Sequence, residues 1–524
     1  MIEEELAGTK AFTLPRDRSR LSVISVAETT SRIREMSFIA TICMAQLCAQ
    51  AGLGQTLATL RDVEDSIGSN DGVALNWSVA GYSLAIGTFI LIAGRLGDVF
   101  GHKRIFIAGF VWSALWATLS GLAIFSNTML FTCGRVFQGT GAAMSLANGI
   151  ALIGTTYPAE KRKSTVLAIL AATSSIGFIL GAGISSAFAL IWWPIAYWVF
   201  ALVLCAVAVV GYFSIASWPE SKAPRTLRSV IDDLDIPGAV IGVASVVLIN
   251  YAFNQAPIEG WARLDIWIAL IGGLLLMTLF VVIERCSVPN PLVPLHALSA
   301  NVALILGAVT CGWACLGIWG FYTWQFLQVI RGLSPLLITA WFSPVVAIGI
   351  LAALTAGQLL DKLRPAAVLT ISMLAFVVGT CLIALVPEDQ PYWGQTFLCM
   401  CVISWAVSMS CPAAIMLVSN SMDKTHQGVA GGLVSAVINY SIALGIGIGG
   451  TVEKEVASHV STVSAVLMGY RAALWMSVGL AGLGVLICLA LQFKMYRRRP
   501  NRCCECHGML AEKIVGEDGL TYTV

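Results

Sequence analysis

The charged side chain with the clearest chemical potential in this sequence is Arg135, because it lies inside a long apolar run at about 129–154. A guanidinium carries five N–H donors and keeps its proton at any usable pH. It can therefore order water, bind an anionic group or lower the pKa of a neighbouring acid. Gln138 and Ser145 follow on the same helical face. We predict that these three residues line a path for a solute or for protons. The alternative is a structural arginine that is hydrogen-bonded to backbone carbonyls.

Two further pairs of polar residues interrupt apolar runs. Gln46 and Gln50 are one helical turn apart, so they share a face. Asn439 and Tyr440 lie in a run near the other end of the chain. A carboxamide that faces lipid is costly, so we expect these side chains to face protein or water. They are candidates to line the same path, and the alternative is that they hold neighbouring helices together.

A short charged stretch separates two of the apolar runs. It contains two glycines, an acid and a basic end, at Gly94, Asp98, Gly101, Lys103 and Arg104. Glycine permits a sharp turn. The carboxylate can accept hydrogen bonds, and the basic side chains can donate to carboxylates or to helix C-termini. The stretch therefore predicts a conformational latch, and the alternative is a simple basic loop on the cytosolic side.

Two short patterns recur at nearly the same spacing. The stretch that ends at Asp98 resembles one that ends at Asp361, at an offset of 263 residues. The Gly181–Gly183 pattern returns at Gly445–Gly447, at an offset of 264 residues. Equal offsets predict two halves built as parallel repeats. The small residues of these runs predict close helix packing, and the candidates are Gly177, Gly181, Gly183, Gly445 and Gly447.

The composition predicts an all-α polytopic membrane protein. The chain has 524 residues, of which 57% are hydrophobic and only 11% are charged, well below the usual charged share of about 25% for a soluble domain. A net charge of +2 gives no reason to expect a nucleic-acid partner. The 15 cysteines are mostly scattered through apolar runs and show no disulfide framework. We predict neither a metal site nor a cofactor.

Fourteen apolar runs reach or approach the length of about 20 residues that a helix needs to cross a bilayer. If the N-terminus is cytosolic, the cytosolic segments hold 25 of the 31 Lys and Arg residues and the outer loops hold five, with Arg135 the remaining one. This asymmetry predicts that both termini are cytosolic. The predicted segments are a disordered tail at 1–35, a six-helix bundle at 36–216, a linker at 217–235, two extra helices at 236–283, a cytosolic loop at 284–300, a second six-helix bundle at 301–492 and a tail at 493–524.

The C-terminal tail carries a cluster of metal-binding residue types, Cys503, Cys504, Cys506 and His507. The cluster is consistent with palmitoylation, with metal binding or with an ordinary cytosolic tail. Its spacing matches no common zinc site, so metal binding is the least favoured of the three.

The Gly94–Arg104 stretch resembles the loop signature of the major facilitator superfamily, with His102 where a basic residue is usual. Arg135 to Ala143 is similar to the fourth-span signature of the same family. The resemblance implies the major facilitator fold, and an arrangement of six, two and six spans is that of its fourteen-span drug:proton antiporter branch. Fungal aminotriazole-resistance-type transporters look most similar, at Gln46–Gln55 and Trp77–Tyr82. In the antiporter signature a proline stands where this chain has Ala182.

The resemblance implies a proton-coupled exporter of small organic molecules that works by alternating access. Its partners would be the substrate, protons and the lipid bilayer, with the proton gradient as energy source and a monomer as the working form. We expect the plasma membrane, with the vacuolar membrane as the alternative. The alternative functions are transport of a small inorganic solute such as borate or ammonium, and nutrient sensing on a transporter fold. No Walker loop, zinc motif or nucleophile elbow suggests an enzyme.

Overall fold

A computed structural model describes residues 32–67, 76–157, 160–216, 234–286, 299–422, 427–457, 463–497, 514–515 and 521–522. Most of the N-terminal tail, most of the linker at 217–235 and the cysteine cluster of the C-terminal tail lie outside these residues.

The described chain is almost entirely helical, and fourteen stretches are long and apolar enough to cross a membrane. The first half contains α2 (Arg32–Ile67), α3 (Asn76–Phe100), α4 (His102–Leu122), the short 3₁₀ turn η2 (Ala123–Phe125), α5 (Thr128–Thr156), α6 (Glu160–Ala189) and α7 (Pro194–Ser214). Two further helices follow, α9 (Ile236–Glu259) and α10 (Leu264–Cys286). The second half contains α11 (Ala300–Gln325), the π-helical turn η4 (Phe326–Ile330), α12 (Pro335–Phe342), α13 (Pro344–Lys362), α14 (Pro365–Ala384), α15 (Gln395–Asn420), α16 (Gln427–Ala457) and α17 (Val463–Arg497). Two short strands, β1 (Ile514–Val515) and β2 (Thr521–Tyr522), pair antiparallel near the C-terminus.

Local sequence explains where several helices begin. The side chains of Asn127 and Ser299 accept hydrogen bonds from the third residue after them, which caps α5 and α11. Proline occupies the first position of α7 and α14, where an N–H would have no partner within the helix, so its absence costs no hydrogen bond. Pro344 has the same role in α13. It also interrupts the helix after Phe342, so this apolar stretch is divided into α12 and α13.

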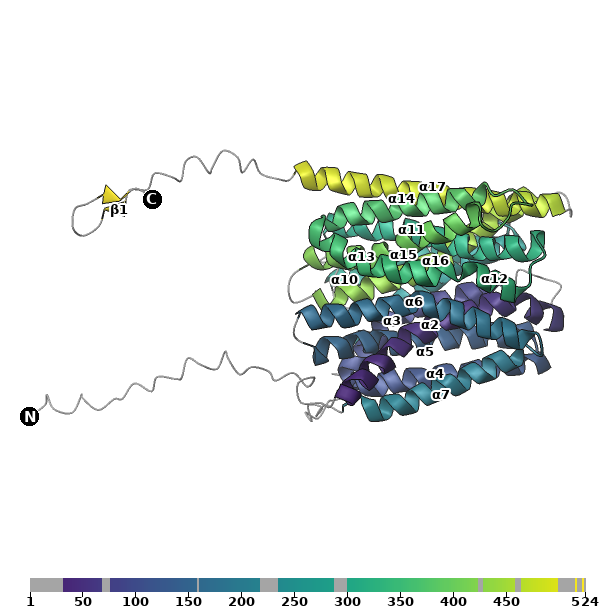
Figure 1. Cartoon of the computed structure of the whole chain (residues 1–524), viewed down its shortest axis with the longest axis horizontal. Coiled ribbons are helices and arrows are strands. Elements are labelled where there is room, and N and C mark those ends of the chain that lie inside the picture. The colour runs from purple at the N-terminus through teal and green to yellow at the C-terminus, as the bar shows by residue number, and fades with distance from the viewer. Residues whose placement is uncertain are drawn as a thin grey trace, which may run out of the picture.

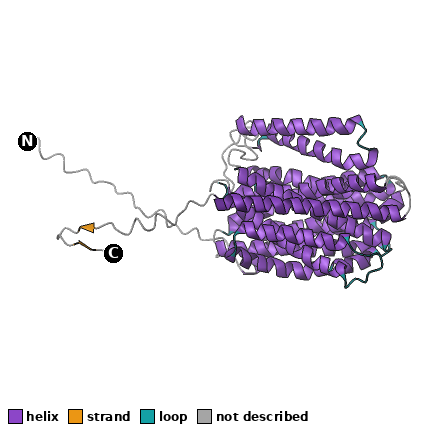
Figure 2. Ribbon diagram, turned by 90° about the horizontal axis from the view of Figure 1, so that it is seen from above, coloured by secondary structure: helices purple, strands orange, loops and turns teal. Residues whose placement is uncertain are grey.

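The helices form two bundles and a hairpin (Figures 1 and 2). In the first bundle α2 packs on α6, and α5 packs on α3 and α4. In the second bundle α11 packs on α16 and α17, and α14 packs on α15. Helix α10 packs on α9, and α9 joins this hairpin to α16 and α3. The fold is therefore the six, two and six arrangement that the apolar runs predict.

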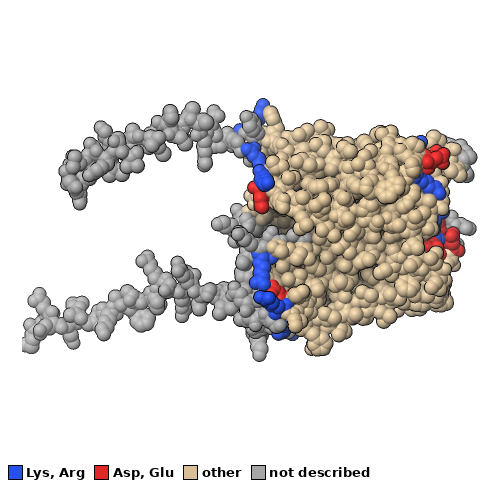
Figure 3. All heavy atoms as spheres, viewed as in Figure 1, with Lys and Arg blue, Asp and Glu red and all other residues tan. Residues whose placement is uncertain are grey.

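The charged residues mark the two ends of the molecule. Figure 3 shows Lys and Arg, with some acidic residues, along the end where α2 begins and α17 ends, acidic and basic residues at the opposite end, and an uncharged belt between them. Helix α2 begins and α17 ends at the same end of the bundle (Figure 1). The basic end fits the cytosolic side of a bilayer, so we call the opposite end the outer end.

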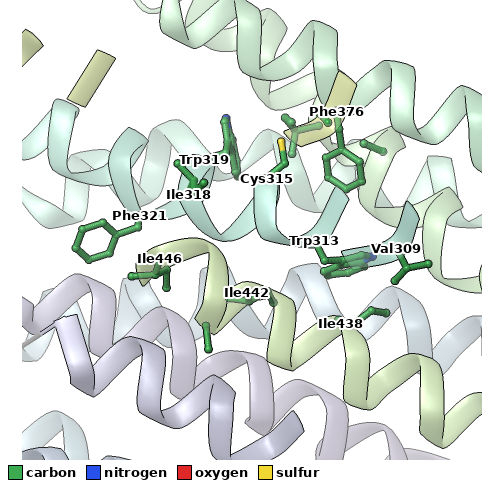
Figure 4. Close-up of a cluster of buried hydrophobic side chains, with 14 of the residues drawn as sticks. Val309, Trp313, Cys315, Ile318, Trp319, Phe321, Phe376, Ile438, Ile442 and Ile446 are labelled. Atoms are coloured by element: carbon green, nitrogen blue, oxygen red, sulfur yellow. The ribbon is translucent and has the colours of Figure 1, made fainter. Parts of the chain in front are cut away.

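The largest buried cluster joins the two halves near the outer end. It includes Leu57 and Val63 of α2 together with Trp324 and Phe342 of the second half. Figure 4 shows part of this core, in which α11 side chains face Ile438, Ile442 and Ile446 of α16. A second cluster lies mainly within the first bundle.

Helix α12 closes the outer end against the first bundle. Its Phe342 lies 6.4 Å, ring to ring, from Phe178 of α6. A Cβ on Gly183 of α6 would meet Thr339 at 3.4 Å, which is ordinary contact. By contrast, α5 and α15, which also belong to different halves, share at most a marginal contact among the described residues. The contacts between α12 and α6 therefore make this a conformation closed at the outer end.

Candidate functional site

Arg135 lies about two turns into α5, as the eighth of its 29 residues, and is completely buried. Its Nη1 donates to Oε1 of Gln138, one turn further on. Its Nη2 donates to the backbone carbonyl of Gly52 in α2 at 2.7 Å. Both partners are among those expected of an arginine in a membrane. A charged donor in this setting makes stronger hydrogen bonds than a neutral one, so α5 is tied firmly to α2.

Two tyrosines flank the guanidinium. Its central carbon lies 4.4 Å from the ring centroid of Tyr82 in α3 and 5.9 Å from that of Tyr197 in α7. Tyr82 donates to the carbonyl of Ala49 at 2.8 Å, and the hydroxyls of Tyr197 and Thr59 are 3.0 Å apart. Aromatic faces stabilise a desolvated cation. Sequence reasoning does not identify these tyrosines as partners of Arg135: Tyr82 enters only within the Trp77–Tyr82 resemblance, and Tyr197 stands alone in an apolar run.

A small cavity lies beside Gln138 and Ser145. It measures about 10 Å³ and is also lined by Tyr82 and Ser113. That volume is close to the minimum for one water molecule. Nε of Arg135 has no hydrogen-bond partner in the described structure. The first bundle thus surrounds Arg135 with bonded carbonyl and amide groups and leaves little room for a solute in this conformation.

Gln46 and Gln50 are in a different environment from Arg135. Both are partly exposed on α2, and the structure records no side-chain hydrogen bond to either among the described residues. Arg135, in contrast, reaches α2 at Gly52. The two glutamines are therefore available to a solute or to water in a way that Arg135 is not.

Asn439 and Tyr440 lie where the two halves meet. A Cβ on Gly87 of α3 would come within 2.6 Å of the Tyr440 backbone nitrogen, so α3 and α16 are in backbone contact there. The Asn439 amide donates to the carbonyl of Ser435 on its own helix at 3.0 Å. The predicted path residues therefore fall into three groups, at Arg135, at Gln46 and Gln50, and at the contact between α3 and α16.

The predicted latch forms the turn between α3 and α4. Gly101 has φ +95°, a conformation that glycine adopts without strain. Asp98 lies 3.4 Å from Nε2 of His102, and its side chain is 57% exposed. The other ring nitrogen of His102 lies 2.9 Å from Oδ1 of Asn148 in α5. A Cβ on Gly97 would overlap Asn148, so the turn rests directly on α5.

The basic end of the latch reaches a helix C-terminus, as expected. Lys103 donates to the carbonyl of Ile215, just after α7, at 2.6 Å. Gly94 has open space around it. Arg104 is exposed and also has an interaction within the protein. Asp361, the counterpart of Asp98 near the end of α13, is exposed, and no ion pair to it is recorded among the described residues.

The packing glycines occupy equivalent places in the two halves. A Cβ on Gly181 of α6 would lie 2.1 Å from the carbonyl of Ala51 in α2. A Cβ on Gly445 of α16 would lie 2.3 Å from the carbonyl of Ala314 in α11. Ala51 and Ala314 are themselves 263 residues apart. Gly177 and Gly447 have similarly close neighbours, whereas Gly183 has only an ordinary contact. The repeat offset thus corresponds to a repeated helix pair.

The aromatic residues at the outer end of α11 are buried in the protein and do not form a belt at the membrane interface. Tyr322 and Trp324 are fully buried, and Trp319 is 5% exposed. Tyr322 donates to the carboxylate of Glu453 in α16 at 2.8 Å. Helix α16 continues to Ala457, so this acid lies within the helix.

A second set of polar contacts holds the cytosolic end of the first bundle. Glu35 of α2 pairs with Arg162 of α6 at 2.7 Å and accepts a hydrogen bond from Tyr157 at 3.0 Å. Burial, together with the hydrogen bond to Glu35, raises the pKa of Tyr157 to about 12. The phenol therefore remains a donor throughout the physiological pH range.

Among the described residues, no cluster of three or more His, Cys, Asp or Glu side chains could hold a metal ion.

Curated relatives cover almost the whole chain. The chain is 42% identical over 507 residues to the "Low affinity ammonium transporter" of Saccharomyces cerevisiae, which covers 96% of this chain and 98% of that protein. It is 40% identical over 469 residues to the "Efflux pump terJ" of Aspergillus terreus, with 88% and 89% covered. It is 33% identical over 460 residues to the "Aminotriazole resistance protein" of Saccharomyces cerevisiae, with 87% and 83% covered.

Solved structures of similar fold are also transporters. A peptide transporter POT superposes with a TM-score of 0.60 at 15% identity, over 88% of this chain and 94% of that one. A bacterial homologue of the lysosomal transporter Spinster, in an inward-facing conformation, gives 0.59 at 11% identity, over 90% and 100%. The family model described as Major Facilitator Superfamily matches residues 42–445 and 302–502. With its fourteen spans, its repeated helix pairs and these relatives, the chain is an integral membrane protein that belongs to the Major Facilitator Superfamily of transporters.

Proposed function

We propose that this protein exports small organic molecules, such as drugs, toxins or secondary metabolites, in exchange for protons, by alternating access at the plasma membrane. The observation that supports this most directly is the charge inside the membrane core. Among the described residues, Arg135 is the only fully buried charged side chain that lies inside a span, two turns from its start, while the buried acids Asp235 and Glu284 lie at helix ends.

A single fixed positive charge suits neutral or anionic substrates better than strongly cationic ones. A permanent cation on a path near Arg135 would need a counter-ion, because separating a charge from water without a partner is costly. The relatives named as an efflux pump and as an aminotriazole resistance protein favour export of organic molecules. The proton gradient would supply about 2.3 kcal/mol per charge for each 100 mV, in addition to the pH difference.

Transport of ammonium is the second candidate, because a relative named for it covers nearly the whole chain at 42% identity. Ammonium is small, and aromatic faces attract it. Buried rings lie near the outer end, among them Trp319, Tyr322 and Trp324. Such a transporter would move its substrate inward, whereas the exporter moves its substrate outward.

The two candidates are separated by flux in sealed proteoliposomes. Transporters oriented with the cytosolic face outward are given a pH gradient, acid inside, and either a panel of radiolabelled azoles and weak acids or labelled methylammonium. Accumulation of an organic compound that collapses with a protonophore supports the exporter. Saturable methylammonium transport without organic accumulation supports the alternative. Absence of flux for every compound, in vesicles that bind substrate, would favour a sensor.

A further inference from the structure

Glu453 is an acid at the outer end of α16 that is enclosed by α11 and α17 of the second half. It projects from the last turns of α16 and is partly buried. It accepts a hydrogen bond from the neutral hydroxyl of Tyr322, at 2.8 Å. No salt bridge to Glu453 is recorded among the described residues. A carboxylate removed from water and held by one neutral donor is poorly compensated.

Close packing builds the site around this pair. A Cβ on Gly449 would lie 2.8 Å from the Tyr322 ring, and a Cβ on Gly469 of α17 would lie 3.1 Å from Cγ of Glu453. The rings of Tyr322 and Tyr470 are 5.6 Å apart. Three helices therefore surround the carboxylate, and two glycines let them come close enough to do so.

The site lies at the seam between the two halves. One continuous buried cluster contains Leu57, Leu60 and Val63 of α2 as well as Tyr322 and Tyr470. Separation of the halves at the outer end would break this cluster and admit water. The charge on Glu453, which is only partly exposed in the closed structure, would then be more fully hydrated.

The other ionisable groups around Glu453 do not neutralise it by contact. Lys454 follows it on α16 and is exposed. Tyr470 of α17 and Tyr322 of α11 are neutral donors at ordinary pH. On α2, Arg61 and Glu64 act electrostatically on Tyr470, and they carry opposite charges. Protonation is thus the simplest way to remove the uncompensated charge when the outer end closes.

The outside medium has a route to this turn of α16. An open pocket of about 220 Å³ is lined by Thr451, Lys454 and Glu455, together with residues of the turn between α9 and α10. Water in this pocket reaches the residues on both sides of Glu453 in sequence.

We propose that Glu453 is a proton-binding residue of the outer gate: it takes a proton from the outside medium when the outer ends of the two halves close, and returns it when they open. By linkage, a group that binds its proton more tightly in the closed form makes acid favour closure. This inference rests on the proposed export by alternating access and concerns its outer gate: a proton taken up and returned on the same side makes closure depend on the external pH but does not itself couple export to the proton gradient.

The test measures closure directly, without a substrate. Spin labels are attached through bio-orthogonal amino acids at Asp65 and Ser464, which are exposed at the outer ends of α2 and α17. Distances are measured in the full-length protein in nanodiscs between pH 5 and pH 8. One linked proton changes the closed-to-open ratio by up to about tenfold per pH unit. We expect the short-distance population to grow as the pH falls.

Glu453→Gln carries no charge at any pH, so its closed population should be high and should change less than about twofold across the range. Glu455→Gln, two residues away and exposed, should behave like the wild type. Tyr322→Phe removes the donor to the ionised carboxylate, so its midpoint should move to higher pH. This second variant keeps the test informative if Glu453→Gln does not fold.

A pH-independent wild type, or a Glu453→Gln variant that keeps the wild-type dependence, overturns the proposal, as does a Tyr322→Phe midpoint at lower pH.

Failure of the gate is distinguishable from failure of the proposed function. If closure follows pH through Glu453 but no pH gradient drives export in vesicles, the gate stands and proton-coupled export does not. If export is proton-driven in Glu453→Gln as in the wild type, coupling lies elsewhere.

Discussion

Arg135 shows how one residue can be both a structural tie and a candidate for function. In the closed structure its guanidinium bonds Gln138 and the Gly52 carbonyl and lies against Tyr82. These contacts compensate a charge that would otherwise be costly in a membrane. The residue is nevertheless held by hydrogen bonds that a conformational change can exchange, because Gly52 lies on a different helix.

We predict that Arg135→Ala and Arg135→Lys both reduce gradient-driven export by at least about tenfold while sparing expression. An ammonium lacks the planar fork that reaches two acceptors at once. The measurement is compound accumulation under an imposed pH gradient at matched surface expression, with Arg263→Lys in an exposed outer turn as control. Wild-type export by both Arg135 variants would show that the arginine is only structural.

Asp98 lies in an exposed ion pair with His102, so its contribution to stability is small, about 1 kcal/mol or less. We predict that Asp98→Asn lowers the transport rate several-fold but shifts the melting temperature little. His102→Lys, which places a positive charge beside Asp98, should retain transport better than His102→Leu. Transport assays and thermal melts on the same preparations check this. Asp98→Asn at the wild-type rate would refute the latch.

Helix α6 and its counterpart α16 are positioned by residues that lack a side chain. At Gly181 and Gly445 the neighbouring helix presents a carbonyl where a Cβ would have to lie. Without a hydrophobic drive between helices in lipid, such close contact is a main source of association. The positions of these helices therefore depend as much on the absence of a side chain at the glycines as on the side chains that are present.

We predict that Gly181→Ala and Gly445→Ala each destabilise the protein by about 1–3 kcal/mol, because the added methyl forces helix backbones apart. Gly183→Ala is the matched control, since its Cβ would meet Thr339 at an ordinary 3.4 Å. Unfolding of purified protein in detergent is the measurement. Equal stability of all three variants would contradict the packing argument.

At the scale of the whole molecule, the two bundles are joined firmly at the outer end and along α3 and α16. Alternating access requires the outer contacts between α12 and α6 to separate while α3 and α16 keep the halves together. The backbone contact at Gly87 makes that seam a suitable pivot, since it contains little side-chain bulk that would have to rearrange.

Topology gives a prediction for the whole chain. Epitope tags at the N- and C-terminus should be reached by antibody only after permeabilisation, because the basic end of the bundle is retained on the cytosolic side. A tag in the turn at Arg263, between α9 and α10, should be reached in intact cells. A terminal tag that is accessible in intact cells would contradict the orientation.

The sequence by itself determined the class and the number of spans and predicts the orientation, because membrane insertion depends on local apolar length and on charge next to each span. It also determined the repeat, since equal offsets mark equal positions in two copies of one helix pair. Only the tertiary structure decided which polar groups meet. Tyr82, Tyr197 and Gly52 converge on Arg135 from three helices, and Tyr322 reaches Glu453 from a fourth. Contacts between helices depend on their rotation and depth, and a lipid-like apolar run specifies neither.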